Sequence, residues 1–232
     1  MADNLPPFPP EPPVMPPPPE PGPQPIPWEQ PGYPALEALY ETAKLLFTKP
    51  SEAFARMPVV GDLGRPLLFA VIFGWIGIIA AQIYNIAMRG AMWNFMPGMR
   101  GMQGFTLPVI WNVATMVLAP IFVLLGVFIW SAILHLFLML VGGANSGFTA
   151  TIRVVCYAGA TQIFAVVPFC GGFIATVWAI VLEIIGLAAA HRTTQGKAAL
   201  AVLLPIVLCC VCLVIIAAAF GAAIFGALGH LR

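Results

Sequence analysis

Charged residues almost disappear from the chain after residue 65, and this scarcity restricts the folds that are open to it. Residues 66–232 contain seven Asp, Glu, Lys and Arg side chains, and 60% of the whole chain is apolar against 8% charged. An ordinary soluble domain carries about 25% charged residues. The composition therefore excludes a soluble globule and predicts an all-α integral membrane bundle. The seven charges are Arg89, Arg100, Arg153, Glu183, Arg192, Lys197 and Arg232.

Five apolar stretches are long enough to cross a bilayer, which takes about 20 residues of helix. Pro108 and Pro120 are expected to interrupt the second stretch, so its membrane part is predicted near residues 117–141. Glycine-rich turns at 142–147 and 168–172 predict hairpins on either side of the third stretch. The five predicted spans are residues 66–88, 117–141, 149–168, 171–190 and 198–228.

Proline dominates the first 34 residues, which hold 16 of the 24 prolines. Because proline lacks a backbone N–H and fixes φ, we expect residues 1–34 to be a disordered tail. The run Pro16–Pro19 fits a PxxP ligand pattern, although a plain spacer is the favoured interpretation.

Residues 35–65 form a second region with helical spacing of apolar side chains. A helix is predicted over residues 35–48, ended by Pro50, and a short second helix is predicted with Ser51 as its N-cap. This amphipathic juxtamembrane segment would either lie in the membrane interface or pack on the cytosolic face of the protein itself. The third region, residues 66–232, is the transmembrane domain.

Lysine and arginine predict the orientation, because cytosolic loops carry an excess of both. With the N-terminus in the cytosol, five spans place seven of these cations inside and three outside. The inner set is Lys44, Lys49, Arg56, Arg65, Arg153, Arg192 and Lys197, and the outer set is Arg89, Arg100 and Arg232. The net charge of +1 leaves no basic patch, which excludes nucleic acid as a partner.

Two ionisable residues lie deep in the predicted spans. His135 and Glu183 are six and seven residues from the cytosolic ends of spans two and four, so equal depth allows a contact between them. Arg153, near the start of span three, is a rival partner for Glu183. An intramembrane carboxylate needs a partner, water or a proton. These residues are interpreted as an interhelical polar clasp, with a proton or ion relay as the alternative.

Sulfur-containing residues do not predict a metal site or a cofactor. Five methionines crowd the first outer loop, but no His or Cys accompanies them, so we expect adaptable apolar contacts there. Cys209, Cys210 and Cys212 lie within one helix and point in different directions, which is poor geometry for a tetrahedral site. The five methionines are Met88, Met92, Met96, Met99 and Met102.

The order of these features resembles the Ypt-interacting-protein (Yip) domain family, in its bacterial branch. The resemblance rests on Asp62-Leu63-Gly64-Arg65-Pro66 at the first span, Arg153 to Gly159 at the third, and His191 to Ala198 between the fourth and fifth. Its motif positions are Asp62, Leu63, Pro66, Tyr157 and Gly159. Eukaryotic members bind small Rab-type GTPases. Here Gly64 and Arg65 stand where their Asp-Leu-Tyr-Gly-Pro motif has Tyr and Gly.

The resemblance implies a multi-pass scaffold or adaptor without catalytic activity, in the bacterial inner membrane. Its partners would be the lipid bilayer and other proteins reached through the N-terminal tail. Small residues at Ala218, Ala222 and Gly226 also allow a homo-oligomer. The alternative is a small transporter or channel that uses Glu183 and His135.

Overall fold

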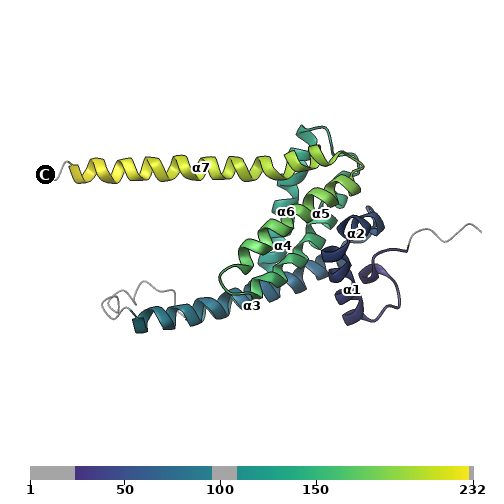
Figure 1. Cartoon of the computed structure of the whole chain (residues 1–232), viewed down its shortest axis with the longest axis horizontal. Coiled ribbons are helices and arrows are strands. Elements are labelled where there is room, and N and C mark those ends of the chain that lie inside the picture. Colours follow the sequence, from purple (N-terminus) through teal and green to yellow (C-terminus); the bar gives the residue numbers. More distant parts are fainter. Residues whose placement is uncertain (1–23, 96–108, 230–232) are drawn as a thin grey trace, which may run out of the picture.

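The computed structural model describes residues 24–95 and 109–229, and all the regular secondary structure in this part of the chain is helical (Figure 1). Helices α3, α4, α5, α6 and α7 build the bundle, and the shorter α1 and α2 lie at one end of it. The elements are η1 (Pro27–Glu29), α1 (Ala35–Thr48), α2 (Pro50–Arg56), α3 (Gly64–Phe95), α4 (Val109–Leu140), α5 (Gly147–Ala158), η3 (Gly159–Val166), α6 (Gly171–Ala190) and α7 (Gln195–Gly229).

The prediction of a multi-pass membrane protein is confirmed. Within the described ranges, five helical stretches are long and apolar enough to span a membrane. They are Gly64–Met88, Trp111–Leu140, Gly147–Val166, Gly171–Ala190 and Gln195–Gly221. The glycine turns between the second, third and fourth stretches have the expected hairpin form, and Gly142 and Gly147 adopt positive φ in the first of these two turns.

Two spans differ from their predicted form. The prediction placed the second span near residues 117–141, but α4 starts at Val109 and continues through Pro120. One proline is tolerated in a membrane helix because neighbouring groups satisfy the freed carbonyl. The third span changes from α-helix to 3-10 helix at Gly159, and its last eight residues form this narrower helix, which rises further per residue than an α-helix.

The N-terminal region also differs from the prediction. Residues 24–34 were expected to belong to the disordered tail, yet Ile26 and Trp28 are buried and Pro27–Glu29 form a turn of 3-10 helix. The remainder of that tail lies outside the described residues. Ser51 is not an N-cap, because α2 already begins at Pro50. Proline suits a first helical position, where its missing N–H would have no partner anyway.

Helix α5 lies at the centre of the molecule, and every residue from Ala150 to Ala158 is buried. It packs against α3, α4 and α6. Helix α2 packs on α6, and α1 packs on η1 and α2 with Ala38, Thr42 and Leu46 buried. The juxtamembrane segment therefore packs on the bundle through α2, while its position relative to the membrane interface stays a prediction.

The far part of α7 leaves the bundle and extends away from it (Figure 1). Leu213, Val214 and Ile215 are each at least 60% exposed. Three consecutive residues cannot share one helical face, so this part of α7 is apolar and exposed around its whole circumference. Such a surface suits the hydrocarbon of a bilayer.

Candidate functional site

Glu29 is held at one end of the bundle by Arg153 and Tyr157. Arg153 Nη1 donates to both carboxylate oxygens of Glu29, at 2.7 and 2.8 Å, and Tyr157 donates its hydroxyl to Glu29 Oε1. Arg153 Nη2 donates to the backbone oxygen of Asp62. The Arg153 and Glu29 side chains are 2% and 11% exposed. We call these four residues the Glu29 cluster; it ties the N-terminal segment to the third span.

Trp28 and Arg65 extend this attachment. Trp28 Nε1 donates to the Arg65 carbonyl at 2.7 Å, and Arg65 Nη1 donates back to the Trp28 carbonyl at 2.8 Å. The Trp28 N–H donates to Thr42 Oγ1 in α1 at 2.9 Å, and the indole ring packs edge-on against Phe69 of α3. The chain before α1 is therefore joined both to α1 and to the start of α3.

The five family-like motif positions occupy two places that the fold brings together. Asp62 contacts Arg153 through its backbone, while its carboxylate accepts from the Gly64 N–H at 3.0 Å at the start of α3. Tyr157 bonds to Glu29. The other three positions are packing sites: Pro66 is buried, Leu63 is half-buried, and Gly159 begins η3 beside Ala70.

His135 and His191 are linked through Thr151 in a second polar group. Thr151 Oγ1 lies 2.8 Å from His135 Nδ1 and 2.9 Å from His191 Nε2. His191 Nδ1 accepts from the Ser146 N–H at 3.2 Å, so the proton of the neutral ring must sit on Nε2. Nε2–H then donates to Thr151, whose hydroxyl donates to His135. Each of the three hydrogen bonds from the Ser146 N–H to His135 Nδ1 then has one donor and one acceptor.

Protonation of His191 would break the string, because Nδ1–H would then face the Ser146 N–H. His191 follows directly after α6 and is completely buried. Burial, together with the nearby His135 ring, lowers the pKa of His191 to about 4. The neutral ring is therefore the form that the surrounding structure accepts.

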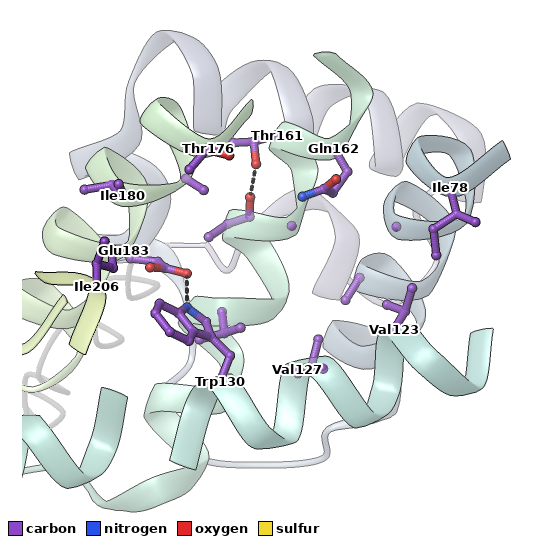
Figure 2. A pocket seen from close by; sticks show the side chains of 17 residues that line it. Ile78, Val123, Val127, Trp130, Thr161, Gln162, Thr176, Ile180, Glu183 and Ile206 are labelled. Atoms are coloured by element: carbon purple, nitrogen blue, oxygen red, sulfur yellow. Dashed lines mark hydrogen bonds between the residues drawn. The ribbon is translucent and has the colours of Figure 1, made fainter. Parts of the chain in front are cut away.

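Glu183 lies in a third place, on the wall of a cavity of about 590 Å³ (Figure 2). Its Oε1 accepts from Trp130 Nε1 of α4 at 2.8 Å, and the residue is 6% exposed. Figure 2 shows the Glu183 carboxylate directed towards the Trp130 indole, with Thr161, Gln162 and Thr176 at the other end of the cavity. The walls come from α3, α4, α5, η3, α6 and α7.

The three polar residues singled out from the sequence thus have separate partners. Glu183 bonds to Trp130, His135 to Thr151, and Arg153 to Glu29. No bond between any two of these three is found in the described part of the chain. Cys156 is buried, whereas Cys170 and the three cysteines of α7 are exposed and free. No metal-binding group of His, Cys, Asp and Glu occurs among the described residues, and most of the methionine-rich loop lies outside them.

A family model for the Yip1 domain matches residues 44–216. The chain belongs to the Yip1 domain family. No curated protein and no solved structure matches it. The Yip1 match begins inside α1, so Asp62, Arg153 and Tyr157 lie within the family domain, whereas Glu29 lies before it. The Glu29 cluster therefore joins a residue outside the Yip1 domain to three residues inside it.

Sequence reasoning missed Glu29, Thr151, His191 and Trp130 as members of these groups. One usable signal was Trp28, the single tryptophan in the first 34 residues. Tryptophan is highly buried on average, so its presence in a proline-rich tail indicates that this part of the tail is packed. The contacts of Thr151 and Trp130 had no comparable signal, because they depend on how α4, α5 and α6 pack.

Proposed function

We propose that this Yip1 domain protein is a non-catalytic membrane scaffold or adaptor in the bacterial inner membrane, with its N-terminus in the cytosol. The observation that carries the proposal is the Glu29 cluster. It holds α1 and α2 against the bundle, so these helices form a fixed surface at one end of the membrane domain. A surface fixed in advance loses less conformational entropy when a partner binds.

The exposed face of α1 is the part of this surface best suited to a partner. Leu36 and Tyr40 lie one helical turn apart and are 84% and 63% exposed. We call these two residues the α1 patch. Exposed apolar side chains grouped on a helix that is otherwise packed are typical of contact sites for other proteins.

The alternative function, a small transporter or channel using Glu183 and His135, has less support. A relay needs polar groups within hydrogen-bond reach of one another along a path. The His135 string runs to Thr151, His191 and the Ser146 N–H, whereas Glu183 bonds to Trp130 in a different place. The two groups therefore act as separate interhelical contacts.

Crosslinking in intact membranes tests the adaptor proposal. The full chain would be compared with the double variant Leu36→Glu/Tyr40→Glu, which alters the α1 patch without touching a buried side chain. The control is Ser51→Glu, which adds a carboxylate at an exposed position of α2 outside the patch. We expect crosslinked partner proteins to be lost from the patch variant and retained in the control. Equal crosslinking by all three proteins would contradict the proposal.

A further inference from the structure

The cavity beside Glu183 is a defined space between packed helices. Its volume of about 590 Å³ lies within the range of about 300–1,000 Å³ that small-molecule sites occupy. Around it the helices are tightly packed, because a Cβ added at Gly74 would lie 2.7 Å from Val123. At Gly126, by contrast, an added Cβ would meet no atom within 4 Å.

Small residues create the space. Gly74, Gly126, Ala158, Gly159 and Ala179 all line the cavity, and of the three glycines Gly126 is the one where an added Cβ meets open space. The remaining walls are mostly aliphatic, from Ile78, Val123, Val127, Val155, Ile180 and Ile206. A molecule held here would therefore make mainly apolar contacts.

Glu183 is the exception to this apolar lining. It is the single acid in the chain after Asp62. Its one hydrogen bond in the described residues comes from the neutral indole of Trp130 at Oε1, and no described Lys, Arg or His forms a salt bridge with it. A carboxylate inside the membrane is costly unless a charge or several donors compensate it. The protein itself supplies one donor.

The other polar groups of the cavity do not call for a second charge. Thr161 donates its hydroxyl to the Ala158 carbonyl at the end of α5, and Thr176 donates to the Gly172 carbonyl within α6, at 2.9 Å in each case. Gln162 is an uncharged amide on η3. The cavity therefore combines an apolar body with a single carboxylate, which suits an apolar molecule carrying one positive charge.

We propose that this cavity binds a hydrophobic amine, a small apolar molecule whose ammonium group pairs with Glu183. The depth of Glu183 favours a free amine over the headgroup of a phospholipid. Glu183 lies seven residues before the end of α6, which is about 10 Å of helix, below the level at which headgroups lie. This site is distant in the chain from the α1 patch and uses none of its residues. If the cavity bound no amine, the adaptor proposal would be unaffected. If the α1 patch bound no partner, the amine-binding proposal would be unaffected.

Equilibrium binding of radiolabelled dodecylamine to the full chain in phosphatidylcholine nanodiscs tests this proposal. Empty nanodiscs supply the background that partitioning into lipid creates. We expect saturable binding above that background, and a loss of affinity of tenfold or more in Glu183→Gln. Dodecanol, which has the same chain without the charge, should compete at least tenfold more weakly than unlabelled dodecylamine.

A second variant keeps the test independent of the folding of Glu183→Gln. Gly126→Leu, at a position where an added Cβ meets no atom within 4 Å, should occupy the cavity and reduce binding at least tenfold while Glu183 is retained. Its matched control is Gly221→Leu, at another helical glycine with no atom within 4 Å, outside the cavity, which should bind like the parent protein. Circular dichroism and gel filtration would confirm that each variant is folded.

The outcomes separate the sources of the amine. If phosphatidylethanolamine in the nanodisc displaces dodecylamine more strongly than phosphatidylcholine does, the ligand of the cavity is a membrane aminolipid. If it does not, the ligand is a free amine. Absence of saturable binding to the parent protein overturns the proposal. So does unchanged affinity in both the folded Glu183→Gln and the folded Gly126→Leu variants.

Discussion

At the scale of single residues, Arg153 has the largest energetic role that the structure indicates. Removing one partner of a buried ion pair costs about 3–5 kcal/mol, because the other charge stays buried without compensation. We therefore expect Arg153→Ala to destabilise the protein by an amount in this range and to release residues 24–62 from the bundle. Unfolding of the purified protein in mixed micelles would measure the stability, and limited proteolysis would detect the released segment.

The matched control for Arg153→Ala is Lys44→Ala, which breaks the exposed pair with Glu41 on α1. Exposed pairs of this kind contribute about 0–1 kcal/mol, so this variant should unfold like the parent protein and resist the protease. Glu29→Gln should release the same segment as Arg153→Ala. Protection of residues 24–62 in both Glu29→Gln and Arg153→Ala would show that the Glu29 cluster does not hold the segment.

A pH dependence should follow from His191. Because its folded-state pKa of about 4 lies below the ordinary value of 6.5, the unfolded chain binds this proton more readily. Its contribution to stability is complete above pH 6.5 and is lost as the pH falls towards 4. We expect His191→Gln to flatten the fall in stability over this range relative to the parent protein, as measured by thermal unfolding at several pH values. If the stability of both proteins fell equally between pH 6.5 and pH 4, the requirement for a neutral His191 in this hydrogen-bonded string would be contradicted.

Single residues also show where sequence reasoning reaches its limit. Asp62, Arg153 and Tyr157 could be singled out because each belongs to a short motif or carries a rare charge. Glu29 could not, because the tail holds several acids among its prolines and the sequence gives no distance to Arg153, 124 residues away. The contact of Glu183 with His135 was predicted from equal depth, but depth does not determine the direction in which each helix turns its side chains.

At the scale of helices, the contact of α2 with α6 depends on Gly186. A Cβ at this position would lie 2.6 Å from Val154 and 2.8 Å from the Phe54 ring. Because overpacking of this kind costs about 1–3 kcal/mol, Gly186→Ala should destabilise the protein and loosen α2. Thermal unfolding and proteolysis near residue 56 would measure both effects.

The control for Gly186→Ala is Gly172→Ala in the first turn of the same helix, where an added Cβ meets no atom within 4 Å. Alanine is the better helix former, by about 1 kcal/mol in a helix interior. This variant should be neutral or slightly more stable. Equal stability of the two variants would mean that Phe54 and Val154 move aside without cost.

Helix boundaries could be predicted where local chemistry decides them. The predicted helix over residues 35–48 and the predicted span over residues 171–190 coincide with α1 and α6. The predicted interruption at Pro120 was wrong, because the bundle supports a helix that proline alone would interrupt. The change from α5 to η3 at Gly159 likewise follows from packing against α3 and α6 rather than from a local signal.

At the scale of the whole molecule, several attachments gather at one end of the bundle. Lys197 at the start of α7 donates to the Gly142 carbonyl at 2.9 Å, and Asn145 donates to the His191 carbonyl at 3.0 Å. The loop after α4 and the loop after α6 therefore lie side by side. Of the seven cations predicted to be cytosolic, three lie in or between α1 and α2, and Arg192 lies in the loop after α6. Arg65 and Lys197 lie in the first turns of α3 and α7, and Arg153 of α5 is neutralised by Glu29.

The orientation of the whole molecule can be tested with its own cysteines, because Cys170 is exposed in the short loop between η3 and α6, at the predicted outer side. A membrane-impermeant maleimide should label it in intact cells or right-side-out vesicles. Cys170→Ser should lose this label, because Cys156 is buried and Cys209, Cys210 and Cys212 lie in a span.

Adding Gln195→Cys to that variant places a thiol at the exposed start of α7, on the predicted cytosolic side. That thiol should react after the membrane is permeabilised and stay protected before. Labelling in the opposite order would reverse the topology and place the α1 patch outside the cell, where the proposed cytosolic partners could not reach it.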